Sequence, residues 1–545
     1  MKNFTYLLIL GVILTSCTSK TSNLSDNNPK SPNILLVMVD DMGWTDIGPY
    51  GGEINTPTID RLTKNGTQFT DFHTSVSCSP TRSMLLSSVD NHMAGLGNMG
   101  ELLSPNQIGK PGYEGYLNQN VASLAEVLKE VGYHTYMGGK WHLGHDKNSI
   151  PSARGFEKTF CILNGGASHF HDMTAIMEAD SVEYALNGKK LDKLPKDFYS
   201  SKSYTDFLIN NIREQEDDQP FFAYLALTAP HDPLHVPEPW LSKYKGMYDE
   251  GYEILRANRI KQVKDLGLIN EVAKTPKMNQ LVKPWQSLSK SKKAIESKNM
   301  EVYAGMIENL DYHMGRMLNF LSDISELENT IVLFLSDNGS NPWSNTDYPG
   351  NGDGVYLSQF DNSINNIGNP TSHMAYGIGW ASASSGPFDY FKMTSGEGGI
   401  RTPLIMSGPG VSKNTINKEL VYVTDIMPTL LDMIGIELID SYRGKKVLPL
   451  MGKSFSKMLN GENSTHYSDK EYIAGEMQNG KWIRKGDFKA VFITKPYGSD
   501  KWELYNLAVD PGETTNLAAL EKELLKDLVQ EWEKYAEEVG VVEFE

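Results

Sequence analysis

The segment Cys78-Ser-Pro-Thr-Arg82 places a cysteine and an arginine one helical turn apart. Apolar residues follow directly, which predicts a helix that begins near Cys78, with Ser79 as its cap and Pro80 in its first turn. A helix N-terminus lowers the pKa of a thiol and attracts anions. The spacing therefore leaves three possibilities for the cysteine: an ordinary buried side chain, a reactive thiol or a modified residue.

Two pairs of oxygen-bearing side chains, Asp40 with Asp41 and Asp337 with Asn338, each follow an apolar run. Hard divalent cations prefer such ligands, and calcium accepts the more flexible geometries. Asp and Asn are also common in turns and helix caps. The two pairs are therefore compatible either with a metal site or with ordinary loop structure.

Lys140 and His142 are two residues apart, so in an extended segment both could face one side. His231 follows another apolar run and a proline. Imidazole titrates near neutral pH and is suited to proton transfer. A Lys-x-His pair is often only a solvated loop, so the residues by themselves assign no role to it.

The apolar runs that precede these residues have the pattern of buried strands. They are Asn33–Val39, Phe221–Leu227, Ile331–Leu335 and Pro403–Met406, with helical patterns such as Val121–Leu128 between them. Strands that alternate with helices predict an α/β fold, with a large, mostly parallel sheet flanked by helices. Ligands of such sheets bind beyond the carboxyl ends of the strands, where the polar residues lie.

The pattern changes from about Ser441, where short strand-like segments precede an amphipathic stretch, Leu520–Glu538. This predicts a smaller C-terminal α+β subdomain of antiparallel strands with a closing helix, over residues 441–545, after a catalytic domain over residues 33–440. The long polar stretches Trp240–Lys298 and Asn341–Lys392 are expected to be insertions at the mouth of a pocket.

Aromatic residues within the second stretch are expected to stack on a sugar or an aryl ring, for example those of Tyr348–Tyr356 and Phe388–Phe391.

The N-terminus has the features of an export signal, with Lys2 followed by an apolar stretch that is too short to span a bilayer. Leu14–Cys17 resembles a bacterial lipobox, so we expect a lipoprotein signal peptide over residues 1–17, lipidation of Cys17 and a flexible tether over residues 18–32. Simple secretory cleavage is the alternative. Both predict an exported protein, periplasmic or anchored to the outer membrane of a Gram-negative bacterium.

The composition of the 545-residue chain excludes some partners and frameworks. The formal net charge of −17 argues against nucleic acid as a partner, because nucleic-acid binders present clustered Lys and Arg. Three cysteines do not make a disulfide scaffold, and Cys161 is expected to be a small buried side chain without a role.

The motifs resemble those of the type I sulfatases, in which C-x-P-x-R is the signature of a modified cysteine. Other segments resemble family motifs in the expected order: Gly138–Gly144, Thr228–His231, Ser336–Gly339, Glu397–Pro403 and Trp502–Leu507. The resemblance extends from Asn33 to Ala518 and is strongest to bacterial arylsulfatases. Ser87-Ser88-Val89 departs from the usual Thr-Gly, at positions where no chemistry is expected.

The resemblance implies an alkaline phosphatase-like fold and a nucleophile made from Cys78, which a formylglycine-generating enzyme would oxidise to formylglycine. It also implies one calcium ion, which would be bound by Asp40, Asp41, Asp337, Asn338 and the modified Cys78. The cation would align the nucleophile with sulfur and offset negative charge.

Roles for the basic residues follow from the same resemblance. Lys140 and Lys392 would bind the sulfate group, and Arg82 would hold the hydrated aldehyde and a carboxylate in place. His142 would take the proton that lets the sulfated hemiacetal collapse, and His231 would donate a proton or a hydrogen bond to the leaving oxygen. One aldehyde hydroxyl would attack sulfur, the alcohol or phenol would leave, and the second hydroxyl would expel sulfate.

The resemblance therefore predicts a sulfuric ester hydrolase that acts on a sulfated small molecule or glycan. The alternatives are a phosphonate or phosphate ester hydrolase with the same signature, a polysaccharide exo-sulfatase, and a lipid-anchored glycan-binding protein without catalysis. The lipid anchor would make the membrane a further partner.

Overall fold

The computed structural model describes residues 1, 31–178, 181–436, 441–442, 444–462 and 465–545. Residues 32–545 form one compact unit. The predicted signal peptide, Cys17 and nearly all of the tether lie outside the described residues, and the expected boundary at residue 440 adjoins the undescribed residues 437–440. No helix in the described part of the chain is both long and apolar enough to cross a membrane.

A ten-stranded sheet forms the centre of this unit, with the strand order β11-β2-β10-β9-β1-β8-β4-β5-β6-β7. In chain order these strands are β1 Asn33–Val39, β2 Gly66–Phe69, β4 His134–Lys140, β5 Lys158–Ile162, β6 Tyr184–Leu186, β7 Lys189–Leu191, β8 Phe221–Ala226, β9 Thr330–Ser336, β10 Leu404–Ser407 and β11 Thr415–Asn417. The central strands β9, β1, β8, β4 and β5 pair in parallel. The predicted strand near Pro403 is β10, and it pairs antiparallel with β9.

Alternate side chains of β1 enter the apolar layers on opposite faces of the sheet. Leu35, Val37 and Val39 belong to one cluster, and Ile34 and Met38 belong to the other. This alternation follows from the two-residue period of a strand and explains why the run is continuously apolar. A strand buried on both faces has no solvent-facing side on which to place polar residues.

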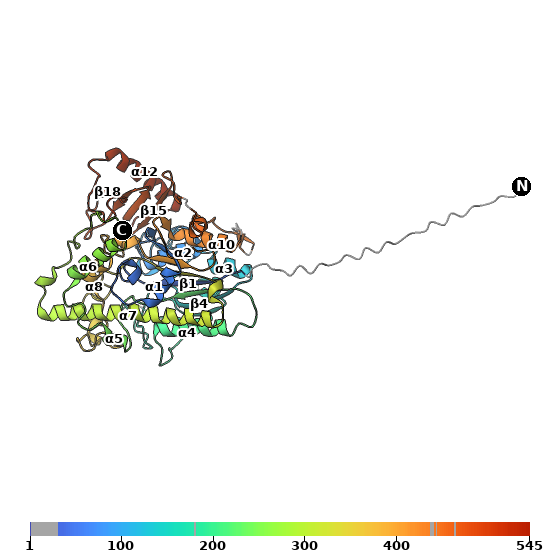
Figure 1. Cartoon of the computed structure of the whole chain (residues 1–545), viewed down its shortest axis with the longest axis horizontal. Helices are drawn as coiled ribbons and strands as arrows, with labels where there is room; N and C mark the ends of the chain where they lie inside the picture. The colour runs from blue at the N-terminus through green and yellow to red at the C-terminus, as the bar shows by residue number, and fades with distance from the viewer. Residues whose placement is uncertain (2–30, 179–180, 437–440, 443, 463–464) are drawn as a thin grey trace. The chain divides into compact units, whose positions relative to one another are not determined.

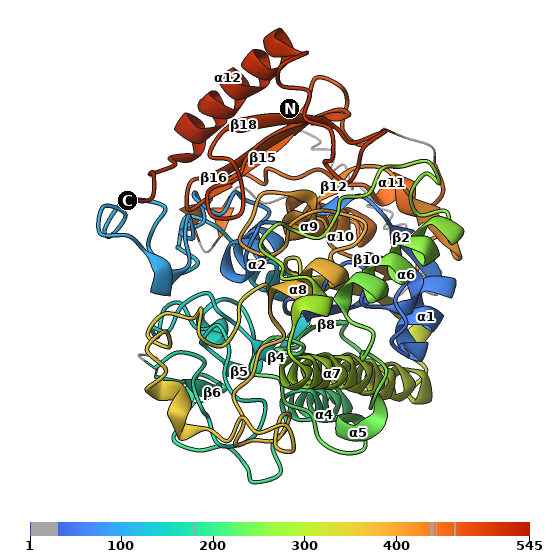
Figure 2. The same ribbon diagram turned by 90° about the vertical axis from the view of Figure 1, so that its left-hand side faces the viewer.

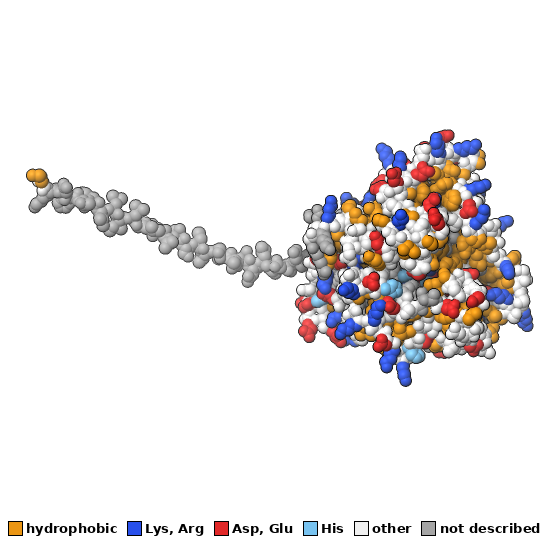
Figure 3. Space-filling model, turned by 180° about the vertical axis from the view of Figure 1, so that it is seen from behind, with side chains coloured by type: hydrophobic (Ala, Val, Ile, Leu, Met, Phe, Trp, Pro, Cys, Tyr) orange, Lys and Arg blue, Asp and Glu red, His pale blue; other side chains and the backbone are white. Residues whose placement is uncertain are grey.

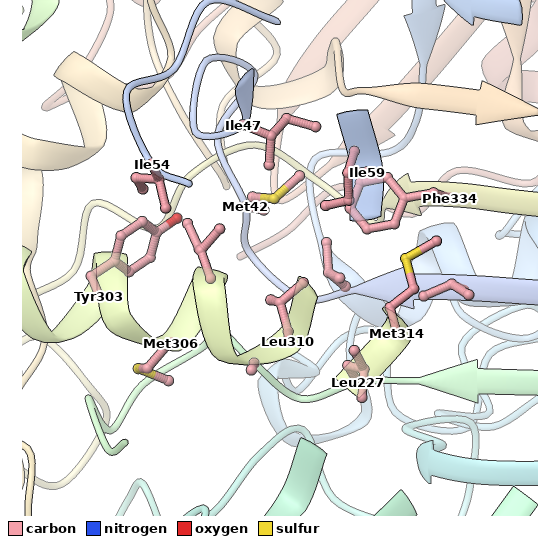
Figure 4. Packing of buried hydrophobic residues seen from close by; sticks show 14 of the residues in the cluster. Met42, Ile47, Ile54, Ile59, Leu227, Tyr303, Met306, Leu310, Met314 and Phe334 are labelled. Atoms are coloured by element: carbon pink, nitrogen blue, oxygen red, sulfur yellow. The ribbon is translucent and has the colours of Figure 1, made fainter. Parts of the chain in front are cut away.

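Helices cover both faces of the sheet. Figure 1 shows α7 (Lys290–Asp323) and α4 (Ser200–Arg213) below the strands, and α2 (Cys78–Ser87), α3 (Leu124–Glu130) and α10 (Ile426–Met433) above them. In Figure 4, side chains of α7 such as Tyr303, Leu310 and Met314 point toward residues beside β1 and β9. The other helices are α1 Pro57–Lys64, α5 Trp240–Lys243, α6 Tyr252–Asp265, α8 Gly377–Ser384, α9 Glu397–Ile400 and α11 Ser456–Leu459.

The helix that carries Cys78 has its N-cap two residues earlier than predicted. Ser77 has extended backbone angles (φ −156°, ψ 164°) and is the N-cap, whereas the predicted cap Ser79 lies inside the helix. Pro80 is therefore the third helical residue, where its missing N–H still costs no intrahelical hydrogen bond. Cys78 consequently occupies the first helical position.

Four antiparallel strands in sequential order form the C-terminal sheet: β15 Tyr472–Met477, β16 Gly480–Lys485, β17 Phe488–Phe492 and β18 Trp502–Asn506. Helix α12 (Lys522–Val539) packs on one face of this sheet through Leu528, Trp532 and Tyr535. Figure 2 shows the helix and the sheet at the top of the molecule. The opposite face, including Trp482 and Val491, joins the apolar cluster under α2. The predicted antiparallel sheet with a closing helix is confirmed.

Two-stranded pairs complete the described structure: β3 Phe72–His73 with β12 Val421–Tyr422, and β13 Ser441–Tyr442 with β14 Lys445–Lys446. On the face shown in Figure 3, acidic and basic side chains are interspersed with one another.

Candidate active site

The carboxyl ends of four neighbouring parallel strands bring the predicted residues together. Asp40 and Asp41 follow β1, Asp337 and Asn338 follow β9, Lys140 ends β4 and His231 lies shortly after β8. All six side chains are buried. The strand order, which is invisible in the sequence, makes these distant residues neighbours.

Cys78 lies against both members of the first acidic pair. Its Sγ is 3.4 Å from Asp40 Oδ1 and 3.8 Å from Asp41 Oδ1, and the residue is 1% exposed. Burial and the negative charge of Asp40 raise the pKa of the thiol well above its usual value, although Lys140 and Lys392 oppose this. The unmodified cysteine is therefore a poor thiolate, which argues against the reactive-thiol interpretation.

Each carboxylate of the cluster is paired with a cation. Lys140 Nζ is 2.6 Å from Asp40 Oδ2, and Lys392 Nζ is 2.8 Å from Asp41 Oδ2. Arg82 donates from Nε and from a terminal nitrogen to Asp337 Oδ2 at 3.0 and 2.7 Å. Lys392 thus reaches the cluster from a distant loop. These pairs offset the large cost of burying charges.

The oxygen-bearing side chains fit a divalent cation. Asn338 Nδ2 donates to Asp41 Oδ1 at 2.7 Å, but Asn338 Oδ1 is buried and has no hydrogen-bond partner among the described residues. A buried acceptor without a partner costs free energy that a bound cation would recover. Burial and the neighbouring Asp40 also raise the pKa of Asp337 to about 6, against the effect of Arg82. Crowded carboxylates and an orphaned amide oxygen are the ligand set that calcium prefers.

The two predicted histidines are held in different ways. His142 has a left-handed backbone (φ 55°), and its Nε2 is 2.9 Å from Glu101 Oε1. His231 Nδ1 donates to the carbonyl oxygen of Asp232 at 2.9 Å, and its Nε2 lies 3.3 Å from Asp41. Burial lowers the pKa of both imidazoles, that of His231 to about 3, although the adjacent carboxylates oppose the shift. Both rings are therefore neutral at neutral pH.

A cavity of about 400 Å³ opens onto these groups. Its inner part contains Cys78, Lys140, Lys392, His142 and His231. Its wall is mostly apolar and comes from several loops, with residues that include Met99–Leu103, Ile176, Met177, Trp343 and Tyr348.

Several expectations about the pocket mouth are wrong. Trp240–Lys298 forms α5, α6 and the start of α7, and it contributes no lining residue among those described. Phe388 and Phe391 are fully buried, so neither can stack on a substrate. Phe388 packs edge-on against Trp44 at 5.1 Å. Aromatic composition does not distinguish a core side chain from a pocket side chain, because both are apolar.

The sequence patterns did not indicate the Met99–Leu103 wall of the cavity, which includes Glu101. The only signal for this wall was a Gly- and Pro-containing stretch between two predicted elements. Cys161 behaves as expected: it is buried in β5, with its Sγ 3.7 Å from the carbonyl oxygen of Ala185.

Comparison with known proteins agrees with this geometry. The sulfatase family model matches residues 32–436, and the model described as N-sulphoglucosamine sulphohydrolase, C-terminal, matches residues 386–538. An uncharacterised sulfatase of Schizosaccharomyces pombe is 42% identical over 94% of this chain and 95% of its own. The arylsulfatase of Klebsiella aerogenes is 39% identical over 78% of this chain and 91% of its own.

Solved structures share the fold. The crystal structure of Ps i-CgsB in complex with k-i-k-neocarrahexaose has a TM-score of 0.66 at 22% identity and covers 93% of each chain. A protein solved with its substrate D-glucosamine-2-N,6-O-disulfate has a TM-score of 0.59 at 19% identity, over 94% of this chain and 98% of its own. This chain belongs to the sulfatase family, and it is a sulfuric ester hydrolase.

Proposed function

We propose that the enzyme hydrolyses sulfate monoesters with a formylglycine nucleophile derived from Cys78 and with one calcium ion. The overall reaction converts a sulfate monoester and water into an alcohol or phenol and hydrogen sulfate. The observation that carries the proposal is the position of Cys78 at the inner end of the cavity, where it meets two carboxylates that are paired with lysines. Converted in place, this residue would sit between an anion-binding site and a cation-binding site.

The bound calcium ion would supply positive charge, and the hydrated formylglycine would supply the attacking hydroxyl. Asp40, Asp41, Asp337 and Asn338 would hold the ion. Lys140 and Lys392 would bind the sulfate oxygens from two sides, since both line the cavity. Such fixed cations stabilise the charge on a transferring group without reorganising during the reaction.

The buried side chains around the nucleophile would orient it and move protons. Arg82 would fix Asp337, to which it donates twice, and would thereby hold one wall of the cation site. His231 already donates its Nδ1 proton to Asp232, so it would need a second proton at Nε2 to serve as the donor to the leaving oxygen, and the neutral His142 would accept a proton.

The cavity wall favours an aryl sulfate or another ester with little additional charge. Lys140 and Lys392 are the only lysine or arginine residues among the described lining residues. Both would already be engaged by the reacting sulfate group. Glu101 and Glu114 place acidic groups on the wall, while Met99, Leu102 and Trp343 are apolar. A polyanionic glycan would find no further cation there. Sulfated sugars, and aryl phosphonates as the phosphorus-ester alternative, are the comparisons to include in the assay.

The decisive experiment is mass spectrometry of the Cys78 peptide from the native host, combined with an aryl sulfate assay. We expect an aldehyde at Cys78, and loss of at least 1,000-fold of sulfate release in Cys78→Ala, on the order of the loss when a catalytic nucleophile is removed. Cys161→Ala is the matched control, because this buried cysteine lies away from the cavity lining. An unmodified thiol in the whole active population would disprove the formylglycine mechanism.

We also propose that the enzyme is exported and lipidated at Cys17, and that a formylglycine-generating enzyme acts on it during maturation. The lipobox-like Leu14–Cys17 supports the anchor. Fractionation of host cells tests it, because Cys17→Ser should move the protein from the membrane fraction to the soluble fraction.

A further inference from the structure

Glu101 contacts a functional histidine from the cavity wall. It lies in the short helix η2 (Gly100–Leu102), 41 residues before His142, and its Oε1 is 2.9 Å from His142 Nε2. The His142 side chain is 8% exposed and that of Glu101 is 31% exposed. The pair thus lies at the boundary between the buried site and the open cavity.

The charges around the pair determine its protonation. Burial, together with Lys140 and Arg82, lowers the pKa of His142, whereas Glu101 raises it. Burial raises the pKa of Glu101, but the neighbouring His142 outweighs this and lowers it to about 2. At neutral pH the pair is therefore a carboxylate that faces a neutral imidazole.

This arrangement selects one tautomer of the ring. A carboxylate only accepts hydrogen bonds, so Nε2 must carry the proton that it donates to Glu101. The lone pair then lies on Nδ1, which is buried and has no hydrogen-bond partner among the described residues. The contact of Nε2 with Glu101 thus determines that Nδ1 is the nitrogen that can accept a proton.

The turn that carries Glu101 is held by hydrogen bonds of the Asn98 side chain. Asn98 Nδ2 donates to the carbonyl oxygen of Leu102 at 2.7 Å, and Asn98 Oδ1 accepts from the N–H of Met99 at 2.9 Å. These bonds clamp both ends of η2. Glu101 therefore approaches His142 from a fixed turn.

We propose that Glu101 is a positioning residue of this enzyme, which fixes the orientation and the Nε2–H tautomer of His142 so that Nδ1 serves as the proton acceptor. The inference rests on the proposed function for the role of His142. It extends that function to a side chain outside the sulfatase motifs identified in the sequence. A polar wall residue would thus act through the histidine and not by contact with the sulfate.

The first test measures the tautomer without turnover. Protein labelled with ¹⁵N-histidine is compared by NMR with Glu101→Leu, in both cases with the unprocessed Cys78 side chain, and the His142 signal is identified by its loss in His142→Gln. We expect Nε2–H in the native sequence and a tautomer mixture in Glu101→Leu. Glu101→Gln retains an acceptor oxygen and should restore much of the native tautomer.

The second test measures turnover. Glu101→Leu should lower kcat for sulfate release about 10–100-fold, as is typical when the partner of a functional histidine is removed. KM should stay within about threefold, since Glu101 holds His142 and not the sulfate. Glu101→Gln should be impaired less. Glu157→Leu is the matched control, because Glu157 Oε2 lies 3.1 Å from His134 Nδ1 and neither residue lines the cavity.

A double-mutant cycle tests whether Glu101 acts through the histidine. In a His142→Ala background, Glu101→Leu should lower kcat by less than about twofold. An unchanged tautomer in Glu101→Leu, or a full loss of kcat that persists in the His142→Ala background, would overturn the inference. Failure of the native enzyme to release sulfate would overturn the proposed function instead, and the NMR result would still test the tautomer.

Discussion

At the scale of single residues, the site resolves a conflict between burial and charge. Asp40, Asp41 and Asp337 lie together out of water, where like charges repel strongly. Lys140, Lys392 and Arg82 each pair with one of them, so no carboxylate of the cluster stands alone. Two of these cations, Lys140 and Lys392, also line the cavity.

The orphaned oxygen of Asn338 makes the metal proposal testable. Asn338→Ala removes a ligand and should weaken calcium binding at least tenfold. Calcium-dependent stabilisation should then fall by about 1.4 kcal/mol or more at a fixed calcium concentration above the Kd. Calorimetric titration and thermal unfolding with and without chelator measure both effects.

Asn309→Ala is the matched control, because the side chain of Asn309 is also buried without a hydrogen-bond partner among the described residues but lies in α7. It should leave calcium binding unchanged. Equal calcium affinity in the native and Asn338→Ala proteins would remove Asn338 from the ligand set.

At the scale of elements, the cavity wall is held by a segment far away in sequence. The loop that carries Met99–Leu103 continues to Tyr113, whose hydroxyl donates to the carbonyl oxygen of Val542 at 3.2 Å and accepts from its N–H at 2.8 Å. Gln107 Nε2 donates to the same carbonyl at 3.0 Å. The residues after α12 therefore attach the wall loop, residues 97–115, to the C-terminal sheet and its helix by hydrogen bonds.

Tyr113→Phe should weaken this attachment of the wall loop. Loss of the hydroxyl removes two hydrogen bonds and leaves the Val542 carbonyl with Gln107 alone, at a cost of about 1–3 kcal/mol. We expect faster amide hydrogen exchange over residues 97–115, a severalfold rise in KM, and a fall in kcat that is smaller than in Glu101→Leu, because this loop carries both the cavity wall and Glu101. Hydrogen-exchange mass spectrometry and steady-state kinetics measure these effects.

Tyr116→Phe provides the comparison within the same loop, since the described structure gives the Tyr116 hydroxyl no hydrogen bond. It should behave like the native enzyme. Identical amide hydrogen exchange in the native and Tyr113→Phe proteins would show that the contact with Val542 does not restrain the wall loop.

At the scale of the whole molecule, buried ionic contacts join the C-terminal sheet to the rest of the unit. Arg484 makes a two-pronged contact with Asp71 at 2.9 and 2.8 Å, and Lys489 contacts Glu397 at 2.9 Å. Asp71 and Glu397 also form a group of metal-type ligands with His73, but basic side chains of the chain itself neutralise it. The C-terminal segment thus contributes to the same buried core that supports α9 and the Lys392 loop.

A second buried contact of this kind makes stability depend on pH. His92 lies between Asp90 at 2.9 Å and Glu476 of β15 at 3.1 Å, and Tyr535 of α12 donates to Asp90 at 2.8 Å. Burial lowers the pKa of His92, but its hydrogen bonds to both carboxylates outweigh this and raise it to about 9. Because the pKa of His92 is raised on folding, protonated His92 contributes its full stabilisation below about pH 6.5, and this stabilisation is lost as the pH rises through about 9.

His92→Gln should therefore destabilise the enzyme most at pH 6, by an amount on the order of 3 kcal/mol, and the difference from the native protein should shrink as the pH approaches 9. Urea unfolding at pH 6, 7.5 and 9 measures this trend. His145→Gln, which changes a more exposed histidine, should have a small effect at every pH. A difference that grows with pH would contradict the assigned charge state.

The sequence by itself predicted the central strands and the polar residues at their ends, and its family motifs implied the chemistry of the site. Asn33–Val39 had to be a doubly buried strand, because it is apolar at consecutive positions, and Asp40 and Asp41 had to lie at its end. The ten site residues converge as the motifs implied, from Asp40 to Lys392. Apolar periodicity predicts the strands and motif order predicts the site residues, whereas the order of the strands in the sheet brings those residues together.

Only the tertiary structure decided which side chains surround the substrate space. Phe388 and Phe391 were indistinguishable from pocket aromatics in sequence, yet packing places them in the core. Glu101 reaches His142 across 41 residues, and Val542 reaches Tyr113 across 429. Such contacts depend on how loops from different strands pack against one another, and no local spacing encodes that.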